Sequence, residues 1–331
     1  MHAFVIDSYK SPLHLSDVPE PTLGEHDLLV EVGAAGLNQL DEKIRVGEFK
    51  QLLRYRTPLT LGHDVAGTVL EVGSAVHGFA PSDIVFARPR DHRIGTFAER
   101  IAIHEADAAH APSSIDVTEA ASLPLVALTA YQALVEIADV RPGQKVLIHA
   151  GAGGVGTIAI QLAKHLGAHV ATTASERDAD FLRDLGADVV IDYRTQDFAA
   201  ELKDYDITLD SLGGENLERS LKVLRRGGVA VGIAGPPTPD FAKKAGLGPV
   251  LRIAITALSR SIRSKAKALG VTYHFLFMHA DGRQLREIAA LVDSGAIRPV
   301  VGITYPFEET PAALAALGST GTRGKAVITR S

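Results

Sequence analysis

Apolar and polar positions in the first third of the chain predict short β-strands separated by turns. Apolar residues dominate three runs, at residues 28–32, 67–72 and 83–86, and glycine or proline residues stand between them. Short strands with frequent turns are typical of a β-rich, barrel-like domain. We therefore expect residues 1 to about 120 to form one β-rich domain.

From Val117 onward the pattern changes to helices and then to strands that alternate with helices. Helical spacing covers Thr118–Ala121 and, after Pro124, continues to Ile137. Strands that alternate with helices predict a parallel sheet with right-handed crossovers. The strand-like runs cover residues 145–150, 169–174, 189–192, 207–210 and 229–233, and the last of them closes the series.

The last part of the chain, from about Val271, mixes both patterns. Residues 282–294 have helical spacing, and residues 300–305 and 325–329 are β-like. The whole chain is therefore expected to be an α/β protein with a β-rich domain and a parallel-sheet domain.

Composition narrows the classes of protein that this chain can belong to. A length of 331 residues is enough for two domains with separate cores. The net charge of −5 argues against a dedicated nucleic-acid binder, which usually carries a strong basic excess. The chain contains no cysteine, which excludes disulfides, thiolate nucleophiles and cysteine-ligated zinc.

Neither a leader nor a membrane span is predicted. Residues 1–7 resemble a strand rather than a charged region followed by an apolar one, so no secretory signal is expected. No uninterrupted apolar stretch approaches the ~20 residues that span a bilayer. We expect a cytoplasmic protein without an integral membrane segment.

The strongest local motif is a glycine-rich loop between a strand-like and a helix-like segment. Strand, glycines and helix in this order are the context in which G-x-G-x-x-G indicates dinucleotide binding. The first glycine is expected to permit a tight turn, the second to let the backbone approach a pyrophosphate, and the third to let the helix pack on its strand. The phosphates would then meet the free N–H groups at the helix N-terminus. The loop consists of Gly151, Ala152, Gly153, Gly154, Val155 and Gly156.

Five motifs together resemble the zinc-free, quinone oxidoreductase-like branch of the medium-chain dehydrogenases/reductases. The resemblance covers nearly the whole chain and rests on residues 36–41, 62–69, 151–156, 210–214 and 324–328. It implies a GroES-like catalytic domain at 1–120, completed by about 271–331, and a doubly wound Rossmann NADP-binding domain at 121–270. It also implies an active site in the cleft between the two domains, and a homodimer.

Zinc-dependent relatives bind their catalytic metal through a cysteine, a histidine and a second cysteine. This chain has Asn38 where the first cysteine would stand, and His63 remains without partners of that kind. The short loop 88–96 has no ligands for a structural zinc. Because a catalytic zinc needs three protein ligands, we expect no metal and interpret His63 as a hydrogen-bonded packing residue.

The segment after the second strand bears on the choice between NAD and NADP. Ser175 and Arg177 suit a 2′-phosphate, since arginine can bind it through two parallel hydrogen bonds. In similar proteins such a pair indicates NADP, with a tyrosine of the next strand stacking nearby, here Tyr193. Two alternatives remain: Glu176 in the role of an NAD-binding acid, and a solvated helix cap without function. NADP(H) is the predicted cofactor.

The resemblance assigns further residues to the cofactor site. Ser175, Arg177 and Tyr193 would be joined by Thr129, Leu212, Gly213, Ile233, Ala234, Gly235, Phe275, Phe277, Gly324 and Lys325. Phe275 and Phe277 are equally candidates for the lining of an apolar substrate pocket or for the core.

Hydride transfer is the chemistry of the cofactor, and the protein supplies position and electrostatics. Asn38 offers a neutral amide donor, which Asp41 would orient, although Asp41 also suits a helix start. No clear proton donor is present, and Tyr55 is a weak candidate. The predicted function is NADPH-dependent reduction of quinones or of the C=C bond of α,β-unsaturated carbonyls, with a small, planar, apolar substrate. The alternatives are an alcohol dehydrogenase and an NADPH-binding structural or regulatory protein.

Residues 239–270 form a basic insert. Seven lysine and arginine residues stand there against the single acid Asp240, with apolar residues at partly helical spacing. One interpretation is an amphipathic helix in weak peripheral contact with an anionic membrane surface. The other is a solvated loop over the cofactor cleft.

Overall fold

The protein divides into two compact units in a computed structural model that describes residues 1–318 and 321–330. Unit 1 comprises Met1–Leu128 together with His279–Ser331, and unit 2 comprises Thr129–Met278. The boundaries at 128 and 278 fall later in the chain than the expected ones, at about 120 and 270. Unit 1 is therefore built from two separate stretches of sequence, and unit 2 from one.

Unit 2 contains a parallel sheet whose described strands follow the order β11–β10–β9–β12–β13–β14. In chain order within the sheet this is 3-2-1-4-5-6, the strand order of the Rossmann fold, with its switch point between β9 and β12. The strands are β9 (Lys145–Ile148), β10 (His169–Ala174), β11 (Val189–Asp192), β12 (Tyr205–Asp210), β13 (Leu224–Gly232) and β14 (Thr272–Phe275). The predicted fold class is thereby confirmed for this unit.

One strand of this sheet was not predicted from the sequence pattern. The series of strands does not close at residue 233, because β14 pairs in parallel with β13, Val229 opposite Thr272. The insert at 239–270 hides this connection, since it separates the two strands by far more than a usual crossover. Residues 272–275 therefore belong to the Rossmann sheet and not to the segment that completes unit 1.

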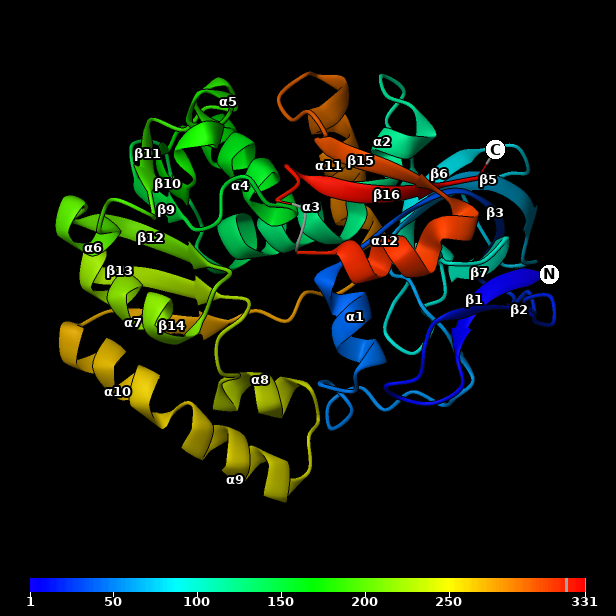
Figure 1. The fold of residues 1–331 in the computed structure, drawn as a ribbon, viewed down its shortest axis with the longest axis horizontal. Helices are drawn as coiled ribbons and strands as arrows, with labels where there is room; N and C mark the ends of the chain where they lie inside the picture. The colour runs from blue at the N-terminus through cyan, green and yellow to red at the C-terminus, as the bar shows by residue number, and fades with distance from the viewer. Residues whose placement is uncertain (319–320, 331) are drawn as a thin grey trace. The chain divides into compact units, whose positions relative to one another are not determined.

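Helices pack on the unit 2 sheet, whose inner strands β9, β10 and β12 are the most deeply buried. Val146, Leu147 and Ile148 of β9 are all inaccessible to solvent, as expected for a parallel strand with both faces covered. Figure 1 shows α10 running along β14, against which it packs. The helices are α4 (Gly154–His165), α5 (Ala179–Asp184), α6 (Phe198–Glu201), α7 (Gly214–Val223), α8 (Pro239–Lys244), α9 (Pro249–Leu258) and α10 (Arg260–Leu269).

Unit 1 is β-rich, as predicted, and contains two sheets among its described residues. The larger one follows the order β15–β16–β3–β5–β6–β8, with β7 also paired to β3, and the smaller one follows β2–β1–β4. The strands are β1 (His2–Ile6), β2 (His14–Asp17), β3 (Asp27–Gly36), β4 (Leu59–Thr60), β5 (Val65–Val72), β6 (Ile84–Ala87), β7 (Arg100–His104), β8 (Ala108–His110), β15 (Val301–Pro306) and β16 (Lys325–Thr329).

The second stretch of unit 1 is joined to the first through β16. This strand pairs antiparallel with β3, where Val327 lies opposite Gly36, and parallel with β15. Gly324, which precedes β16, has a φ of +65°, and a Cβ there would collide with the carbonyl oxygen of Val300. The helices of this unit are α1 (Gln39–Arg45), α2 (Val117–Ala121), α11 (Gly282–Asp293) and α12 (Thr310–Ala316).

The boundary between the units falls inside a helical stretch. Helix α3 (Pro124–Tyr131) is followed directly by a π-helix at Gln132–Ile137, so the helical pattern expected up to Ile137 is confirmed with a change of winding. Across the described residues, no helix combines the length and the apolar character that a bilayer crossing requires.

Candidate functional site

The glycine-rich loop joins β9 to α4 at the carboxyl edge of the unit 2 sheet. A Cβ on Gly156 would lie 2.7 Å from the Cα of Gly151 and still nearer to the carbonyl oxygen of Ala150. A Cβ on Gly151 would collide with the hydroxyl of Thr172, whereas one on Gly153 would meet only the Ala150 oxygen, at 3.3 Å. Gly151 and Gly156 are thus needed for packing, and Gly153 leaves its backbone approachable.

The tight turn of this loop is made by a residue other than the expected one. Ala150 has a φ of +53°, while none of the loop glycines has a positive φ. Gly151 therefore serves close packing rather than the turn. Helix α4 begins at Gly154 with Gly153 as its N-cap, which has no side chain to accept the first N–H groups. Gly154, Val155 and Gly156 form the first turn, whose N–H groups are the donors that phosphate oxygens use.

A buried, neutral histidine holds the glycine-rich loop through Thr173. His149 is buried, and its Nε2 and Nδ1 lie 2.8 Å from Ser220 Oγ and 3.0 Å from Thr173 Oγ1. Because the Ser220 hydroxyl donates to the Asn216 carbonyl, it accepts from Nε2–H, which leaves Nδ1 as an acceptor. Thr173 Oγ1 also accepts the N–H of Ala150 at 3.2 Å. Burial, with a further contribution from Arg219, lowers the pKa of His149 to about 4.

Acidification should weaken the protein through this histidine. In the unfolded chain His149 binds a proton once the pH falls below its ordinary pKa of 6.5, whereas in the folded protein it does so only near pH 4. The stabilising contribution is therefore full above pH 6.5 and is lost as the pH falls toward 4, by about 3 kcal/mol at most. We expect the free energy of unfolding to fall less steeply over this range in His149→Asn than in the parent protein. His2→Asn, at an exposed position, is the control, and equal slopes in all three proteins would contradict the assignment.

Two cationic side chains follow neighbouring strands of the same sheet edge. Ser175 and Arg177 lie after β10, with Ser175 buried and the guanidinium of Arg177 more than half exposed. The N–H of Tyr193 donates to the carbonyl of Ala174 at 3.1 Å, so the ends of β10 and β11 adjoin. The guanidinium carbon of Arg194 lies 5.7 Å from the centre of the exposed Tyr193 ring. Arg194 was not among the residues predicted for the cofactor site, although it directly follows Tyr193.

The loops after β12 and β13 lie against each other. Gly213 has a φ of +70°, its N–H donates to Asp210 Oδ1 at 2.6 Å, and its Cβ would lie 2.7 Å from the Ala234 carbonyl oxygen. The N–H groups of Leu212 and Ile233 donate to the same Asp210, to its carboxylate and its carbonyl respectively. Burial raises the pKa of Asp210. These contacts bring together Leu212, Gly213, Ile233, Ala234 and, one residue further, Gly235.

The two phenylalanines assigned to the cofactor pack on a third. Phe275 and Phe277 contact Phe241 of α8, with ring centroids 5.1 and 5.9 Å apart. Both are half-buried, and their assignment to the cofactor stays a prediction. Thr129, also assigned to the cofactor, is buried in α3.

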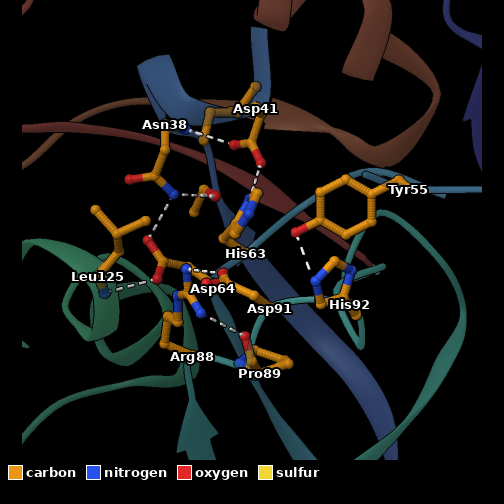
Figure 2. Close-up of polar contacts among 12 residues, drawn as sticks. Asn38, Asp41, Tyr55, His63, Asp64, Arg88, Pro89, Asp91, His92 and Leu125 are labelled. Carbon is orange, nitrogen blue, oxygen red and sulfur yellow. Dashed lines mark hydrogen bonds and ion pairs between the residues drawn. The ribbon is translucent and has the colours of Figure 1, made fainter. Parts of the chain in front are cut away.

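Unit 1 contains a buried polar cluster around Asn38, shown in part in Figure 2. Asn38 precedes α1, and its N–H donates to Asp41 Oδ2 at 2.8 Å. Its side-chain Nδ2 donates to the Gly36 carbonyl at 3.3 Å and to Asp64 Oδ2 at 2.9 Å. Since an amide nitrogen has two hydrogens, both are directed into the protein. Asn38 is therefore held in place, and its amide does not serve as the outward donor that we expected.

Lys325 is the cation of this cluster. Its ammonium donates to the Leu37 carbonyl at 2.7 Å, to Asn38 Oδ1 at 2.5 Å and to Asp64 Oδ2 at 3.0 Å. The side chain is 6% exposed, and that of Asp64 is fully buried. All three N–H groups thus have acceptors within unit 1, so we assign Lys325 to this cluster rather than to the cofactor.

His63 and Asp64, neighbours in the chain, extend the cluster in two directions. His63 Nδ1 lies 2.5 Å from Asp41 Oδ1, and both side chains are fully buried (Figure 2). Asp64 Oδ1 accepts the N–H of Leu125 at 2.7 Å, in the first turn of α3. Of the two roles considered for Asp41, the helix start is the one observed, since its carboxylate accepts the backbone N–H of Asn38 and contacts His63, not the Asn38 amide.

Tyr55 is poorly suited to donate a proton. Burial raises its pKa above the ordinary value, and the charge of Asp91 adds to the effect. Its hydroxyl oxygen accepts the backbone N–H of His92 at 3.5 Å (Figure 2). A phenol with a raised pKa is a weaker acid, which counts against a catalytic role.

Comparison with known proteins places this chain in a family. Residues 24–113 match the alcohol dehydrogenase GroES-like domain, and residues 185–328 match the model described as zinc-binding dehydrogenase. The mitochondrial NAD(P)H oxidoreductase RTN4IP1 of Bos taurus is 34% identical over 99% of this chain and 89% of its own length. The chain belongs to the quinone oxidoreductase-like medium-chain dehydrogenases/reductases. The resemblance drawn from the motifs is thereby confirmed.

Two further members of this dehydrogenase/reductase family indicate the chemistry of its neighbours. The chloroplastic NADPH-dependent alkenal/one oxidoreductase of Arabidopsis thaliana is 33% identical, over 95% of this chain and 74% of its own. The quinone oxidoreductase from Coxiella burnetii superposes with a TM-score of 0.85 at 31% identity, over 99% of both chains. The chain is accordingly an oxidoreductase with a nicotinamide cofactor. Its cytoplasmic location stays a prediction.

The name of the matched zinc-binding family raises the question of whether these residues fit a zinc ion. At the expected place stand an amide and the ammonium of Lys325, a cation that would repel the metal. His63 is bound through Nδ1 to Asp41, and the described residues hold no group of three or more potential ligands among histidine, aspartate and glutamate. A zinc site needs at least three such ligands. This donor set does not fit zinc, and we derive no step through a metal.

The loop at 88–96 is fixed by ion pairs. Arg90 binds Asp107 through two hydrogen bonds of 2.7 and 2.8 Å, and Arg93 binds Asp27 in the same way at 2.7 and 2.9 Å. The fully buried Arg88 also contacts Asp91 at 2.7 Å. Paired N–H donors of arginine match a carboxylate in geometry, so each pair fixes orientation as well as position.

Proposed function

We propose that this protein is an NADPH-dependent reductase of quinones or of the C=C bond of α,β-unsaturated carbonyls, acting without a metal ion. The observation that carries the proposal is the pair of guanidinium groups, Arg177 and Arg194, after two adjoining strands. Two such groups, together with the hydroxyl of Ser175, suit the two negative charges of a 2′-phosphate. The alternative in which Glu176 binds a ribose hydroxyl would give neither arginine a part in cofactor binding.

The residues of the glycine-rich loop have defined parts in this proposal. Gly153 and the first turn of α4 would bind the pyrophosphate, and Gly151 and Gly156 keep the loop close enough to do so. Leu212, Gly213 and the segment Ile233–Gly235 would border the nicotinamide ribose and carboxamide. When bound, the reduced nicotinamide supplies a hydride. The neutral His149 holds the loop through Thr173.

The proposed acceptor rests on the names of the relatives. The proposed proton source rests on the side chains of Asn38, Asp41 and Tyr55. The names of the relatives mention alkenals, alkenones and quinones, whose common feature is a carbonyl conjugated to a C=C bond. Asn38 and Asp41 have positioning roles in the buried cluster, and Tyr55 is a weak acid, so we propose that water supplies the proton. The acceptor would be small, planar and apolar, and the active form a homodimer.

The purified protein is expected to oxidise NADPH with quinones or enones in the presence of EDTA. A panel of one quinone, one enone, one alkenal and one saturated aldehyde, each tested with NADPH and with NADH, checks this. We expect at least about tenfold higher kcat/KM with NADPH, the value of one charge-assisted pair. Turnover confined to the aldehyde and abolished by EDTA would identify an alcohol dehydrogenase, and binding of NADPH without any turnover would favour a regulatory role.

The same assay on variants separates the cofactor assignment from the reaction. Arg177→Ala and Arg194→Ala should each raise KM for NADPH about tenfold and leave KM for NADH unchanged. Arg183→Ala removes an exposed arginine that pairs with a neighbour on its own helix, Asp180, and is the matched control. A parallel rise of KM for both cofactors would remove these arginines from 2′-phosphate recognition.

A further inference from the structure

The exposed face of α9 carries the most exposed large apolar side chains of the described residues. Val250, Ile253 and Leu258 are 78, 71 and 64% exposed. Ala254 and Ala257, also exposed, complete a row at positions i, i+3, i+4, i+7 and i+8 of one helix. Such spacing places all five on one side of the helix. We call these five residues the α9 stripe.

The opposite side of α9 is turned toward the protein. Ile255 is buried and Leu251 half-buried, and Ser259, directly after the helix, is buried with its hydroxyl on the Ile255 carbonyl at 2.9 Å. The helix is therefore attached by a narrow apolar edge while the broader α9 stripe faces outward. An outward apolar stripe of this size is more than scattered surface residues require.

The segment that carries the α9 stripe is basic. Residues 239–270 carry seven lysines and arginines against Asp240 alone, in a chain whose net charge is −5. Two of the seven have partners in unit 2: Lys265 pairs with Glu218, and Arg263 donates to Ser259 Oγ and the Thr256 carbonyl. The other five are all exposed: Lys243, Lys244, Arg252, Arg260 and Lys267.

We propose that α8–α10 bind the surface of an anionic lipid bilayer, with the α9 stripe inserted among the headgroups. Aliphatic residues on one side of a helix with cations around them are the pattern of helices that lie in the interface plane. Ten residues of α9 extend about 15 Å, too short to span a bilayer but sufficient to lie in its surface. Figure 1 shows α8, α9 and α10 in succession on the side of unit 2 that carries β14.

Charge and composition favour lipid over the other occupants of such a face. A symmetric contact between two copies would bring the same patch of each together, and with it the cations of both. A protein partner is usually met by aromatic residues at the centre of an interface, and the α9 stripe has none. Anionic headgroups satisfy the cations, and acyl chains satisfy the aliphatic groups. The proposal is independent of the reductase activity.

Vesicle flotation with the full-length protein tests the proposal. The protein should float with vesicles of phosphatidylcholine and phosphatidylglycerol at low salt, and not with phosphatidylcholine alone. The triple variant Val250→Ser, Ile253→Ser, Leu258→Ser should lower the partition coefficient about tenfold or more. Replacing Lys243, Lys244 and Arg260 by glutamine should do likewise and reduce the salt dependence. A matched control replaces three exposed apolar residues of unit 1, Leu15, Leu70 and Ile84, by serine and should bind like the parent protein.

A site-specific signal can be obtained because the chain contains no tryptophan. Ile253→Trp should show a blue-shifted emission with anionic vesicles, and Leu70→Trp should not. Failure to float, flotation equally affected by the control variant, or no shift at position 253 would each overturn the proposal. Self-association that only the Val250/Ile253/Leu258 variant abolishes, without flotation, would show instead that the face joins two copies. NADPH binding by each variant confirms that it is folded.

Discussion

Methionine in place of Lys325 should lower the free energy of unfolding by about 3–5 kcal/mol. The ammonium has three hydrogen bonds, and its removal leaves the fully buried carboxylate of Asp64 without a cation. Removing one partner of a buried pair costs more than the pair contributes, because the remaining charge stays desolvated. Urea denaturation at pH 7.5 measures the loss.

Lys164→Met is the matched control for this change. Lys164 pairs with Asp188 at 2.9 Å, but about a third of each side chain is exposed, so the loss should be below about 1 kcal/mol. The double variant Lys325→Met, Asp64→Asn should recover part of the stability, because no charge is then left unpaired. Equal effects of the two lysine changes would show that the cluster around Asn38 is not an energetic unit.

Alanine at Gly156 should abolish cofactor binding and destabilise unit 2 by about 3 kcal/mol. The added Cβ would meet two backbone groups, the Ala150 carbonyl and the Gly151 Cα, and neither can yield as a flexible side chain would. The loop would have to open, and the distance between β9 and α4 would increase. Thermal unfolding and titration of NADPH fluorescence measure the two effects.

Substitutions at two other glycines distinguish the effect of steric crowding from the effect of a lost phosphate contact. Gly153→Ala adds a Cβ that meets only one atom, at 3.3 Å, so the variant should fold normally and lose affinity for NADPH alone. Gly248→Ala, before α9, has no atom within 4 Å and should change neither property. If Gly153→Ala bound NADPH like the parent protein, the backbone at 153 would not contact the pyrophosphate.

Local pattern was sufficient to predict most of unit 2. Its strands are short apolar runs bounded by turns, and the inner strand β9 is buried along Val146–Ile148, as in a parallel sheet with both faces covered. The glycine-rich loop was predictable for the same reason, since its strand and helix are contiguous. Strand β14 was not, because its pairing with β13 crosses an insert with helices of its own. The left-handed Ala150 was also unforeseen, since glycine is the usual residue for such a φ.

Contacts between residues far apart in the sequence could not be predicted from local pattern. Lys325 and Asn38 are 287 positions apart, and nothing local to either shows that an ammonium meets an amide. Asn38 was expected to present a donor because its position was known from the family while its partners were not. The packing of Phe275 and Phe277 on Phe241 likewise depends on a helix of the insert.

The discontinuous sequence of unit 1 has a consequence for the order in which the protein is made. Unit 2 is continuous, and all its residues are translated before residues 279–331. While the Rossmann unit is being synthesised, the edge of β3 therefore has no β16 to pair with. The carboxylate of Asp64 likewise has no Lys325 to neutralise it. A nascent chain halted before residue 325 would carry an open sheet edge beside a buried, unneutralised acid, which are the features that chaperones and proteases act on. Quality control during synthesis would thus act mainly on unit 1.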